Sequence, residues 1–291
     1  MTIVILRGGL GNQLFQIAAG LHFEDGDPGS VRIDDRFLAT DKNKRAPQLE
    51  TLGFRFARAG RLTHGIVRIV AHYARKTTKA RRAAGNRLWA YLSDDKDESQ
   101  GARLATARIR ILDGYWQRYA MVDESIELVR ERLRSTERLA PSAARLMAEV
   151  RARRSLAVHV RRGDYVSDPA ANAVHGTCGT DYYRAAVRLI QSERTIDAIY
   201  VFSDDIGWAE ENLDLGTEVV YANADRELSE AEEFRIMAAC RYFIIANSTF
   251  SWWAARISDS PDKMVVAPRR WFRDPRDSAE ALIPPEWHRV G

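Results

Sequence analysis

The sequence has too few cysteines for a disulfide framework. Only Cys178 and Cys240 occur in 291 residues, and they form no C-x-x-C pair. Small extracellular domains that are held together by disulfides are therefore excluded. We expect a reducing compartment in which both thiols have structural roles.

Other absences narrow the function classes further. No apolar run is long enough to cross a bilayer, and the start, MTIVILRGG, lacks the basic leader and cleavage site of a secretory signal. The formal charge of +4 is too modest to indicate a nucleic-acid partner. The six histidines show no ligand spacing and no carboxylate pair forms a D-x-D at a strand end, so we expect no metal.

Apolar strands alternate with helical patterns in both halves of the chain. Short, nearly continuous apolar strands between helices predict parallel sheets covered on both faces. We therefore predict an α/β protein of two Rossmann-like domains, residues 1–150 and 151–291. The expected strands are 3–6, 31–33, 109–112, 156–160, 199–202, 218–221, 242–246 and 264–267, and the main helices are 13–22, 124–133, 142–151, 181–192, 230–239 and 252–257.

Residues 61–87 form a basic segment without any acidic residue. Its apolar positions recur at helical spacing, which predicts an amphipathic helix. Such a helix can lie on an anionic membrane surface. The alternative is a solvated helix that packs on its own domain.

The sequence HVRRGDY offers a first anion site. His159 and Arg161 share one face because side chains alternate along a strand, and Arg162 points the other way. Ligands bind beyond the carboxyl ends of strands in open α/β sheets, and a guanidinium there can hold a phosphate without metal. The alternative is an ordinary salt bridge between Arg161 and Asp164.

Two further turns also follow buried strands. Asn247, Ser248 and Thr249 precede a helix whose N-terminus can bind an anion, unless they only cap it. Gly9 and Gly11 form part of a dinucleotide-binding turn, but Leu14 stands where a third glycine is required. A complete dinucleotide fingerprint is therefore absent.

A pair of adjacent glutamates starts the helix at 230. Glu232 is explained by a capping box with Ser229, whereas Glu233 is not. Glu233 faces the same strand ends as Asn247 in a parallel fold, where a carboxylate could accept two N–H bonds from guanine.

Taken in order, these motifs resemble glycosyltransferase family 11, the α-1,2-fucosyltransferases. The matching stretches are GGLGNQLFQ at the start, GYWQ at 114–117, HVRRGDYV at 159–166, HG-x-C at 175–178, FSDD at 202–205 and IIANSTFSWWAA at 244–255. The resemblance implies a GT-B architecture, in which an N-terminal acceptor domain and a C-terminal GDP-L-fucose-binding domain face a cleft.

The resemblance also implies roles for individual residues. Arg161 contacts the donor β-phosphate, Ser248 and Thr249 lie at the phosphates, and Glu233 binds guanine where Asp is the more usual residue. Asn12 lies near the fucose and the acceptor. The full predicted nucleotide-sugar site is Gly9, Gly11, Asn12, His159, Arg161, Ser203, Asp204, Glu233, Asn247, Ser248 and Thr249.

The implied reaction is an inverting transfer of L-fucose to the 2-hydroxyl of a galactoside, without cofactor or metal. Arg161 and the helix N-terminus stabilise the charge that grows on the leaving phosphate. Asp164, Asp168 and His175 are the candidates for the general base, and Tyr115 and Trp116 for a surface on which the acceptor sugar stacks.

The resemblance further implies a place in the cell. The acceptor is expected in surface-polysaccharide synthesis on a galactose-terminated, lipid-linked glycan. The enzyme would then be cytoplasmic and visit the inner membrane through residues 61–87. No nucleic-acid partner is expected.

Three alternatives stay open. A glycosyltransferase of the same fold could use another nucleotide sugar or another acceptor. A dinucleotide-dependent oxidoreductase could use the first glycine turn, although Leu14 argues against it. A non-catalytic module would bind GDP or a glycan without turnover.

Overall fold

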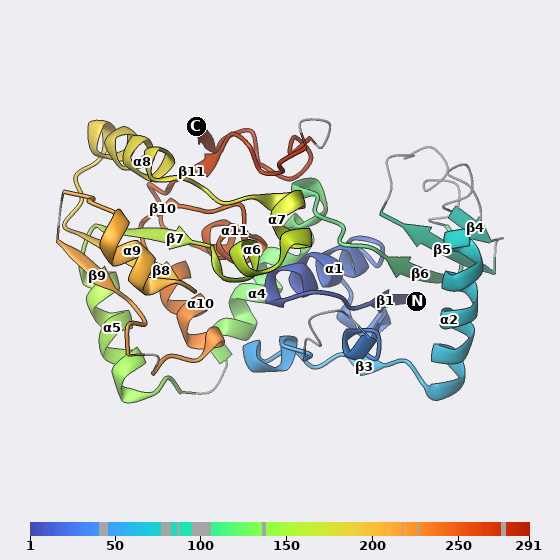
Figure 1. Ribbon diagram of the computed structural model, residues 1–291. Coiled ribbons are helices and arrows are strands. Elements are labelled where there is room, and N and C mark those ends of the chain that lie inside the picture. Colours follow the sequence, from blue (N-terminus) through green and yellow to red (C-terminus); the bar gives the residue numbers. More distant parts are fainter. Residues whose placement is uncertain are drawn as a thin grey trace. The chain divides into compact units, whose positions relative to one another are not determined.

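The protein forms two compact α/β units, Met1–Thr136 and Glu137–Gly291 (Figure 1). The computed structural model describes residues 1–40, 46–76, 83–85, 88–94, 106–135, 138–216, 218–225, 227–274 and 278–291, with the side chains of all of these except 40, 73–76, 83–85, 164, 170 and 171.

The sheet of unit 1 has the strand order β3-β2-β1-β6-β5-β4. All neighbouring strands run parallel except β4 and β5, which are antiparallel. The strands are β1 (Thr2–Ile5), β2 (Val31–Asp34), β3 (Ala57–Arg58), β4 (Ala83–Gly85), β5 (Trp89–Ser93) and β6 (Ile109–Asp113).

Helices cover both faces of this sheet. Helix α2 (Arg61–Lys76) packs Val67 and Ala71 against Ile3 and Ile5 of β1. Helix α1 (Leu10–His22) lies on the opposite face and contacts α4 (Asp123–Ser135). A Cβ atom at Gly20 of α1 would lie 2.7 Å from Val4, so glycine permits the close approach of helix and strand.

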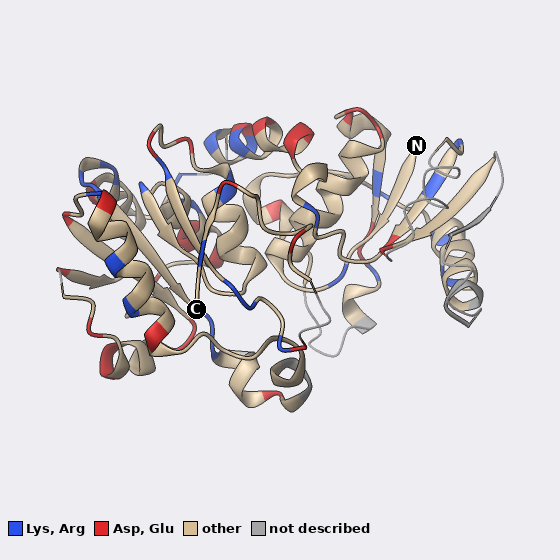
Figure 2. Ribbon diagram, turned by 90° about the horizontal axis from the view of Figure 1, so that it is seen from above, with Lys and Arg blue, Asp and Glu red and all other residues tan. Residues whose placement is uncertain are grey.

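The basic segment predicted at 61–87 is therefore helical over its first part. Its inner face packs on its own unit, as the alternative prediction required. The helix α2, at the right of Figure 2, carries basic residues and no acidic ones. Among the described residues, no helix combines the length and apolar character needed to span a bilayer.

The sheet of unit 2 has the order β12-β11-β10-β7-β8-β9, and all its neighbouring strands are parallel. Its central strands are buried along their whole length, which explains their continuous apolar sequences. The strands are β7 (Ser155–Val160), β8 (Ala198–Ser203), β9 (Val219–Tyr221), β10 (Tyr242–Ile244), β11 (Met264–Pro268) and β12 (His288–Val290).

Two helical layers enclose this second sheet. Val158 and Val160 of β7 pack with Tyr183 and Ile190 of α8 on one face. On the other face the ring of His159 lies 5.8 Å from that of Phe250 in α11. The helices are α5 (Pro141–Ala152), α6 (Gly163–Ser167), α7 (Pro169–His175), α8 (Thr180–Glu193), α9 (Ile206–Asn212), α10 (Glu230–Ala238) and α11 (Thr249–Ile257).

The unit boundary lies between Thr136 and Glu137, earlier than the predicted boundary at 150/151. The reason is helix α5, which packs on α10 of unit 2. The backbone N–H of Ala140 donates a 2.8 Å hydrogen bond to Glu232 Oε1, which ties the start of α5 to the capping box of α10. The predicted α/β class with parallel sheets is confirmed.

Candidate functional site

Polar residues gather at one edge of the unit 2 sheet, where its parallel strands end; we call it the carboxyl edge. The turns after β7, β8 and β10 contribute the HVRRGD, SDD and NST stretches that the sequence singled out. Because β10, β7 and β8 are neighbours in the sheet, these turns lie side by side. The sheet topology thus brings together residues that are far apart in the sequence.

Arg161 forms an ion pair with Asp204. Its Nη1 lies 3.0 Å from Asp204 Oδ2, and its guanidinium carbon lies 5.6 Å from the centre of the Tyr165 ring. Asp204 Oδ1 also accepts a 2.8 Å hydrogen bond from the backbone N–H of Arg162. A Cβ at Gly163 would lie 2.7 Å from Asp204, so glycine is required for this approach.

Arg162 has different neighbours, as the strand alternation predicts. Its Nε lies 3.2 Å from Asp205 Oδ2, and its guanidinium lies 4.0 Å from the centre of the Trp208 ring in α9. Asp205 in turn accepts from the backbone N–H of Trp208 and caps α9. Arg162 therefore braces the α9 side of the turn, whereas Arg161 lies on the side of α10.

His159 is buried and uncharged. Burial, with a smaller contribution from Arg161, lowers its pKa to about 3. Its Nδ1 is buried and has no hydrogen-bond partner among the described residues. A neutral imidazole with an unused nitrogen is suited to a polar ligand group.

Glu233 is a buried carboxyl group close to this cluster. Burial raises its pKa to about 7, and the charges of Asp204 and Arg161 also act on it. Asn223 Nδ2 donates a 3.1 Å hydrogen bond to Glu233 Oε2 and holds the group in place. Glu233 thus titrates near neutral pH, in a position to accept hydrogen bonds.

Asn247 has its hydrogen-bonding capacity used within the protein. Its Nδ2 donates to the carbonyl oxygens of His175, Gly176 and Trp271, and its exposure is 2%. Its own carbonyl accepts from the hydroxyl of Tyr165. Asn247 therefore fixes the loops around the site.

The neighbouring Ser248 and Thr249 start helix α11. Ser248 occupies the N-cap position but makes no capping hydrogen bond with its side chain. The simple capping explanation of this serine is therefore wrong, and its hydroxyl is available at the helix N-terminus. Trp252 and Trp253 are fully buried, as expected for packing residues.

The three general-base candidates that the sequence suggested are His175, Asp164 and Asp168, and they have different surroundings. The His175 ring stacks on Tyr165 with centroids 4.8 Å apart, and Phe272 lies 6.0 Å away, so it is held among aromatic rings. The side chain of Asp164 lies outside the described part, and Asp168 is partly exposed. Over the described residues, no group of three or more His, Cys, Asp or Glu side chains is placed to hold a metal ion.

The glycine turn of unit 1 is organised around Gly8. Gly8 has φ +69, and a Cβ there would lie 2.6 Å from Asn12 Nδ2, whereas Gly9 is the N-cap of α1 and Gly11 lies within the helix. Asn12 Oδ1 accepts a 2.9 Å hydrogen bond from Gln117 of the GYWQ stretch. The GGLGNQLFQ and GYWQ motifs of this unit are thus joined directly.

Trp116 belongs to the core and not to a stacking surface. Its exposure is 6%, its φ is 53, and its ring lies 6.1 Å from Phe23. Asp94 accepts its backbone N–H at 2.5 Å and so holds this unusual conformation. Tyr115 alone of the two aromatic residues is exposed, at 43%.

The sequence did not lead us to predict two ionic pairs in unit 1, at the edge where its parallel strands end. Arg7 Nε lies 3.0 Å from Asp113 Oδ1, and His64 Nδ1 lies 2.7 Å from Asp34 Oδ2. Phe37 separates them, with Arg7 5.1 Å and the His64 ring 5.2 Å from its ring centre. Asp34 and Asp113 end β2 and β6, which was the one signal in the sequence that could have found them.

The sequence model of glycosyl transferase family 11 matches residues 60–290. The chain belongs to this family. The family match covers both the basic helix of unit 1 and the whole carboxyl edge of unit 2. It confirms the family that the ordered motifs predicted.

Relatives within this family differ in how much of the chain they share. The Escherichia coli O-antigen biosynthesis glycosyltransferase WbnK is 43% identical over 116 residues, which are 40% of this chain and 38% of that protein. The alpha-1,2-colitosyltransferase of Escherichia coli is 27% identical over 100% of this chain and 99% of its own. The galactoside alpha-(1,2)-fucosyltransferase 1 of Saimiri sciureus is 29% identical over 37% of this chain and 30% of its own.

Among solved structures, a mutant of Arabidopsis thaliana FUT1 in complex with GDP superposes with a TM-score of 0.49. It is 13% identical and covers 91% of this chain and 69% of its own.

Proposed function

We propose that this family 11 glycosyltransferase transfers L-fucose from GDP-L-fucose to the 2-hydroxyl of a galactoside, with inversion and without a divalent metal. Unit 2 binds the donor and unit 1 the acceptor. The supporting observation is the group of Arg161, Asp204 and Glu233 at one sheet edge. A guanosine diphosphate needs a cation for its diphosphate and a carboxylate for its base, and this edge offers both.

Each residue then has a defined part in binding. Glu233, held by Asn223, accepts the N–H groups of guanine in its ionised form. Arg161 and the N-terminus of α11, with Ser248 and Thr249, contact the diphosphate. His159 offers its unused nitrogen, and Asp204 keeps Arg161 in place. Ser203 Oγ accepts from the backbone N–H of Asp205 and so shapes the same turn.

The charges suggest how the leaving group departs. An acceptor hydroxyl attacks the anomeric carbon from the face opposite GDP, and the bond to the β-phosphate breaks. Negative charge grows on the phosphate, where Arg161 and the helix N-terminus stabilise it more strongly than in the bound donor. In this proposal Arg161 supplies the positive charge for which other transferases use a metal.

A second donor has specific support. The relative that spans the whole chain carries a name that assigns it colitose transfer. Colitose is the 3-deoxy analogue of L-fucose, so the same nucleotide site would serve either sugar. The discriminating contact is therefore one to the sugar 3-hydroxyl.

The test is release of GDP from GDP-L-fucose, with and without lactose, in the presence of EDTA. GDP-colitose, GDP-mannose and UDP-galactose are run in parallel. We expect lactose-stimulated GDP release and a fucosylated product. If the enzyme prefers GDP-colitose, GDP-L-fucose is not its main donor. Activity only after Mg²⁺ addition would overturn the proposed role of Arg161.

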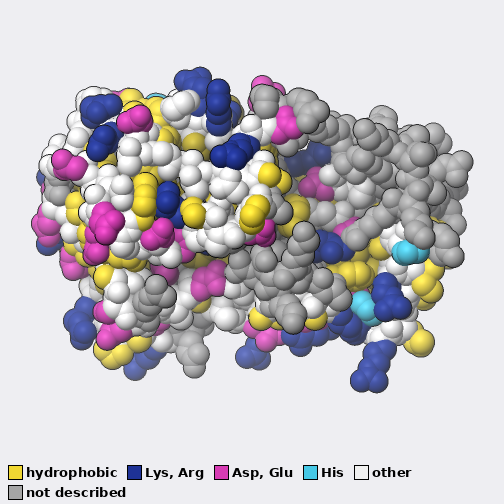
Figure 3. All heavy atoms as spheres, in the orientation of Figure 1, with side chains coloured by type: hydrophobic (Ala, Val, Ile, Leu, Met, Phe, Trp, Pro, Cys, Tyr) yellow, Lys and Arg dark blue, Asp and Glu magenta, His cyan; other side chains and the backbone are white. Residues whose placement is uncertain are grey.

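We also propose that helix α2 rests on an anionic membrane surface, at the cytoplasmic face of the inner membrane. Leu62, Ile66 and Ile69 point outwards, with exposures of 87%, 60% and 59%. At 100° per residue they lie within about 60° of each other, away from the inner residue Val67. In Figure 3 hydrophobic and basic side chains lie together over α2.

The charge of the segment suits the same surface. Arg61 and Arg68 are exposed and lie together along one side of the outer apolar stripe of α2. Arg75, Lys76, Lys79, Arg81, Arg82 and Arg87 continue the basic run, and their side chains lie outside the described part. A membrane visit would give access to a lipid-linked acceptor.

Cosedimentation with vesicles tests the surface. Wild type should bind phosphatidylglycerol-containing vesicles and not pure phosphatidylcholine. The variant Leu62→Ser/Ile66→Ser/Ile69→Ser should lose this binding, and so should Arg61→Gln/Arg68→Gln. Arg184→Gln/Arg188→Gln on α8 removes the same charge elsewhere and should change nothing. Equal binding by all variants would refute the surface.

A further inference from the structure

The Asp34–His64 pair has the geometry of an oriented base. Asp34 ends β2, its side chain is fully buried, and its Oδ2 lies 2.7 Å from His64 Nδ1. His64 stands in the first turn of α2, where the backbone N–H of His64 donates to Gly60. The helix start and the strand end thus hold both partners in place.

The buried carboxylate selects one tautomer of the imidazole. An ionised Asp34 can only accept, so Nδ1 carries the proton and Nε2 keeps its lone pair. The His64 side chain is 22% exposed, and no described residue hydrogen-bonds to Nε2. The free lone pair therefore points to a partly exposed position and away from Asp34.

Charged and aromatic side chains surround this pair. Arg36 approaches the other oxygen, with Nη1 3.8 Å from Asp34 Oδ1, and the Phe37 ring covers one side of His64. Arg7, beyond Phe37, is neutralised by Asp113, which also accepts from Tyr91. Asp34 therefore lies next to the ring of His64 without a competing contact from Arg7.

The location also fits the acceptor. Asp34 ends the strand next to β1, whose following turn carries Gly8 and Asn12. The pair therefore lies along the edge of unit 1 at which the glycine turn stands. Ligands of open α/β sheets bind at this edge.

We propose that His64, oriented by Asp34, is the general base that deprotonates the acceptor hydroxyl. The proton moves from the hydroxyl to Nε2 while the oxygen lone pair forms the bond to the anomeric carbon. The bond from that carbon to the β-phosphate oxygen breaks, and its electron pair leaves with the nucleoside diphosphate. This inference rests on the proposed sugar transfer but not on which sugar is transferred.

The test compares His64→Gln, His64→Ala and Asp34→Asn with wild type, and His72→Gln serves as the matched control. His72 is an exposed histidine about two turns further along the same helix. The measurements are kcat/KM for transfer against pH, GDP affinity, and recovery of activity by added imidazole. The donor is whichever one wild type turns over.

We expect His64→Gln to lower kcat/KM by about 100-fold or more, with GDP affinity unchanged. The acid limb of the pH profile should disappear in this variant, and imidazole should restore part of the activity of His64→Ala. Asp34→Asn should show a smaller loss, and His72→Gln should match wild type. A merely structural role would give no imidazole rescue.

Transfer by His64→Gln close to the wild-type rate would overturn the inference. Loss without rescue, accompanied by loss of GDP affinity, would overturn it as well. Failure of the proposed function would appear differently, as absence of transfer from GDP-L-fucose by wild type itself.

Discussion

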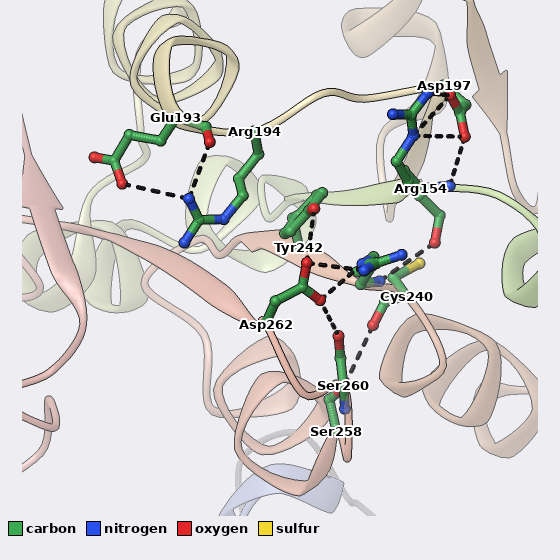
Figure 4. Close-up of polar contacts among 11 residues, drawn as sticks. Arg154, Glu193, Arg194, Asp197, Cys240, Tyr242, Ser258, Ser260 and Asp262 are labelled. Atoms are coloured by element: carbon green, nitrogen blue, oxygen red, sulfur yellow. Dashed lines mark hydrogen bonds and ion pairs between the residues drawn. The ribbon is translucent and has the colours of Figure 1, made fainter.

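The two edges of the unit 2 sheet hold charged groups in opposite ways. At the amino edge, where the strands begin, Arg154 pairs with Asp197 (Figure 4). Arg241 pairs with Asp262 at the same edge. At the carboxyl edge, Arg161 pairs with Asp204 near the buried Glu233. Both edges join neighbouring strands by ion pairs, but only one holds groups away from their usual protonation.

At the amino edge, the pairs favour the charged forms. Hydrogen bonds from Arg154 lower the pKa of Asp197 to about 2, and Arg241 lowers the pKa of Asp262. At the carboxyl edge, burial raises the pKa of Glu233 to about 7 and lowers that of His159 to about 3. The difference indicates that the ion pairs of the amino edge stabilise the fold. Burial of Glu233 and His159 at the carboxyl edge lowers stability, and a bound ligand can offset that loss.

Arg161→Ala should have the largest effect of any change at the carboxyl edge. We expect a loss of about 1,000-fold in kcat/KM, because the charge on the leaving phosphate would lose its stabilising cation. Arg162→Ala should lose about tenfold, since it acts through the α9 side of the turn. Steady-state GDP release measures both, and Arg154→Ala at the amino edge is the control. Equal losses at 161 and 162 would contradict the assignment of their faces.

GDP affinity should depend on pH through Glu233. The ionised carboxylate accepts from guanine, so affinity should fall as pH drops below about 7. Glu233→Gln should bind about tenfold more weakly at pH 8 and lose most of this dependence. Titration calorimetry from pH 5.5 to 8.5 measures it, with the exposed Glu227→Gln as control. An unchanged pH profile in Glu233→Gln would rule out a guanine contact.

The same substitution should stabilise the free protein at high pH. The folded pKa of Glu233 lies above its ordinary value, so the free energy of unfolding falls as pH rises from about 4.5 to about 7. Glu233→Gln removes this penalty and should raise Tm by about 2–4 °C at pH 8 but hardly at pH 4. Calorimetry without nucleotide measures the difference. A lower Tm of Glu233→Gln at pH 8 would mean that the ionised Glu233 carboxylate does not destabilise the folded protein.

Replacing a carboxylate at the amino edge should lower Tm, whereas Glu233→Gln should raise it. This is the smallest effect that we expect. Asp197 has a depressed folded pKa, so its stabilisation is present above pH 3.8 and is lost as pH falls through about 2. Asp197→Asn should lower Tm by about 1–3 °C at pH 7, with unchanged turnover. Reduced turnover in this variant would mean that the two edges are not functionally separate.

The sequence predicted the fold well where patterns are local. The capping box of Ser229 and Glu232 is present as expected, and strand 156–160 is β7 with its alternation intact. The domain boundary was placed too late, because it depends on which unit α5 packs against. That contact involves Ala140 and Glu232, which no local pattern connects.

The side-chain pairings at the candidate site could not be read from the sequence. Arg161 was expected to contact either a phosphate or Asp164. The structure shows an ion pair with Asp204, and the side chain of Asp164 lies outside the described residues. Asn247 was expected to contact the ligand, yet its amide bonds three loop carbonyls. The sequence offered only the position of Asp34 at a strand end, and it did not connect Asp34 with His64, because the two residues belong to separate elements.

The sequence by itself determined the family, the parallel α/β class and the faces of the strand residues, since these follow from motif order and from the period of side chains along a strand. Only the tertiary structure decided which carboxylate meets Arg161, how strongly Glu233 is desolvated, and which histidine is oriented by a buried aspartate. The physical reason is that pairing and burial depend on which strand ends become neighbours in a sheet, and strand order is a property of the whole fold.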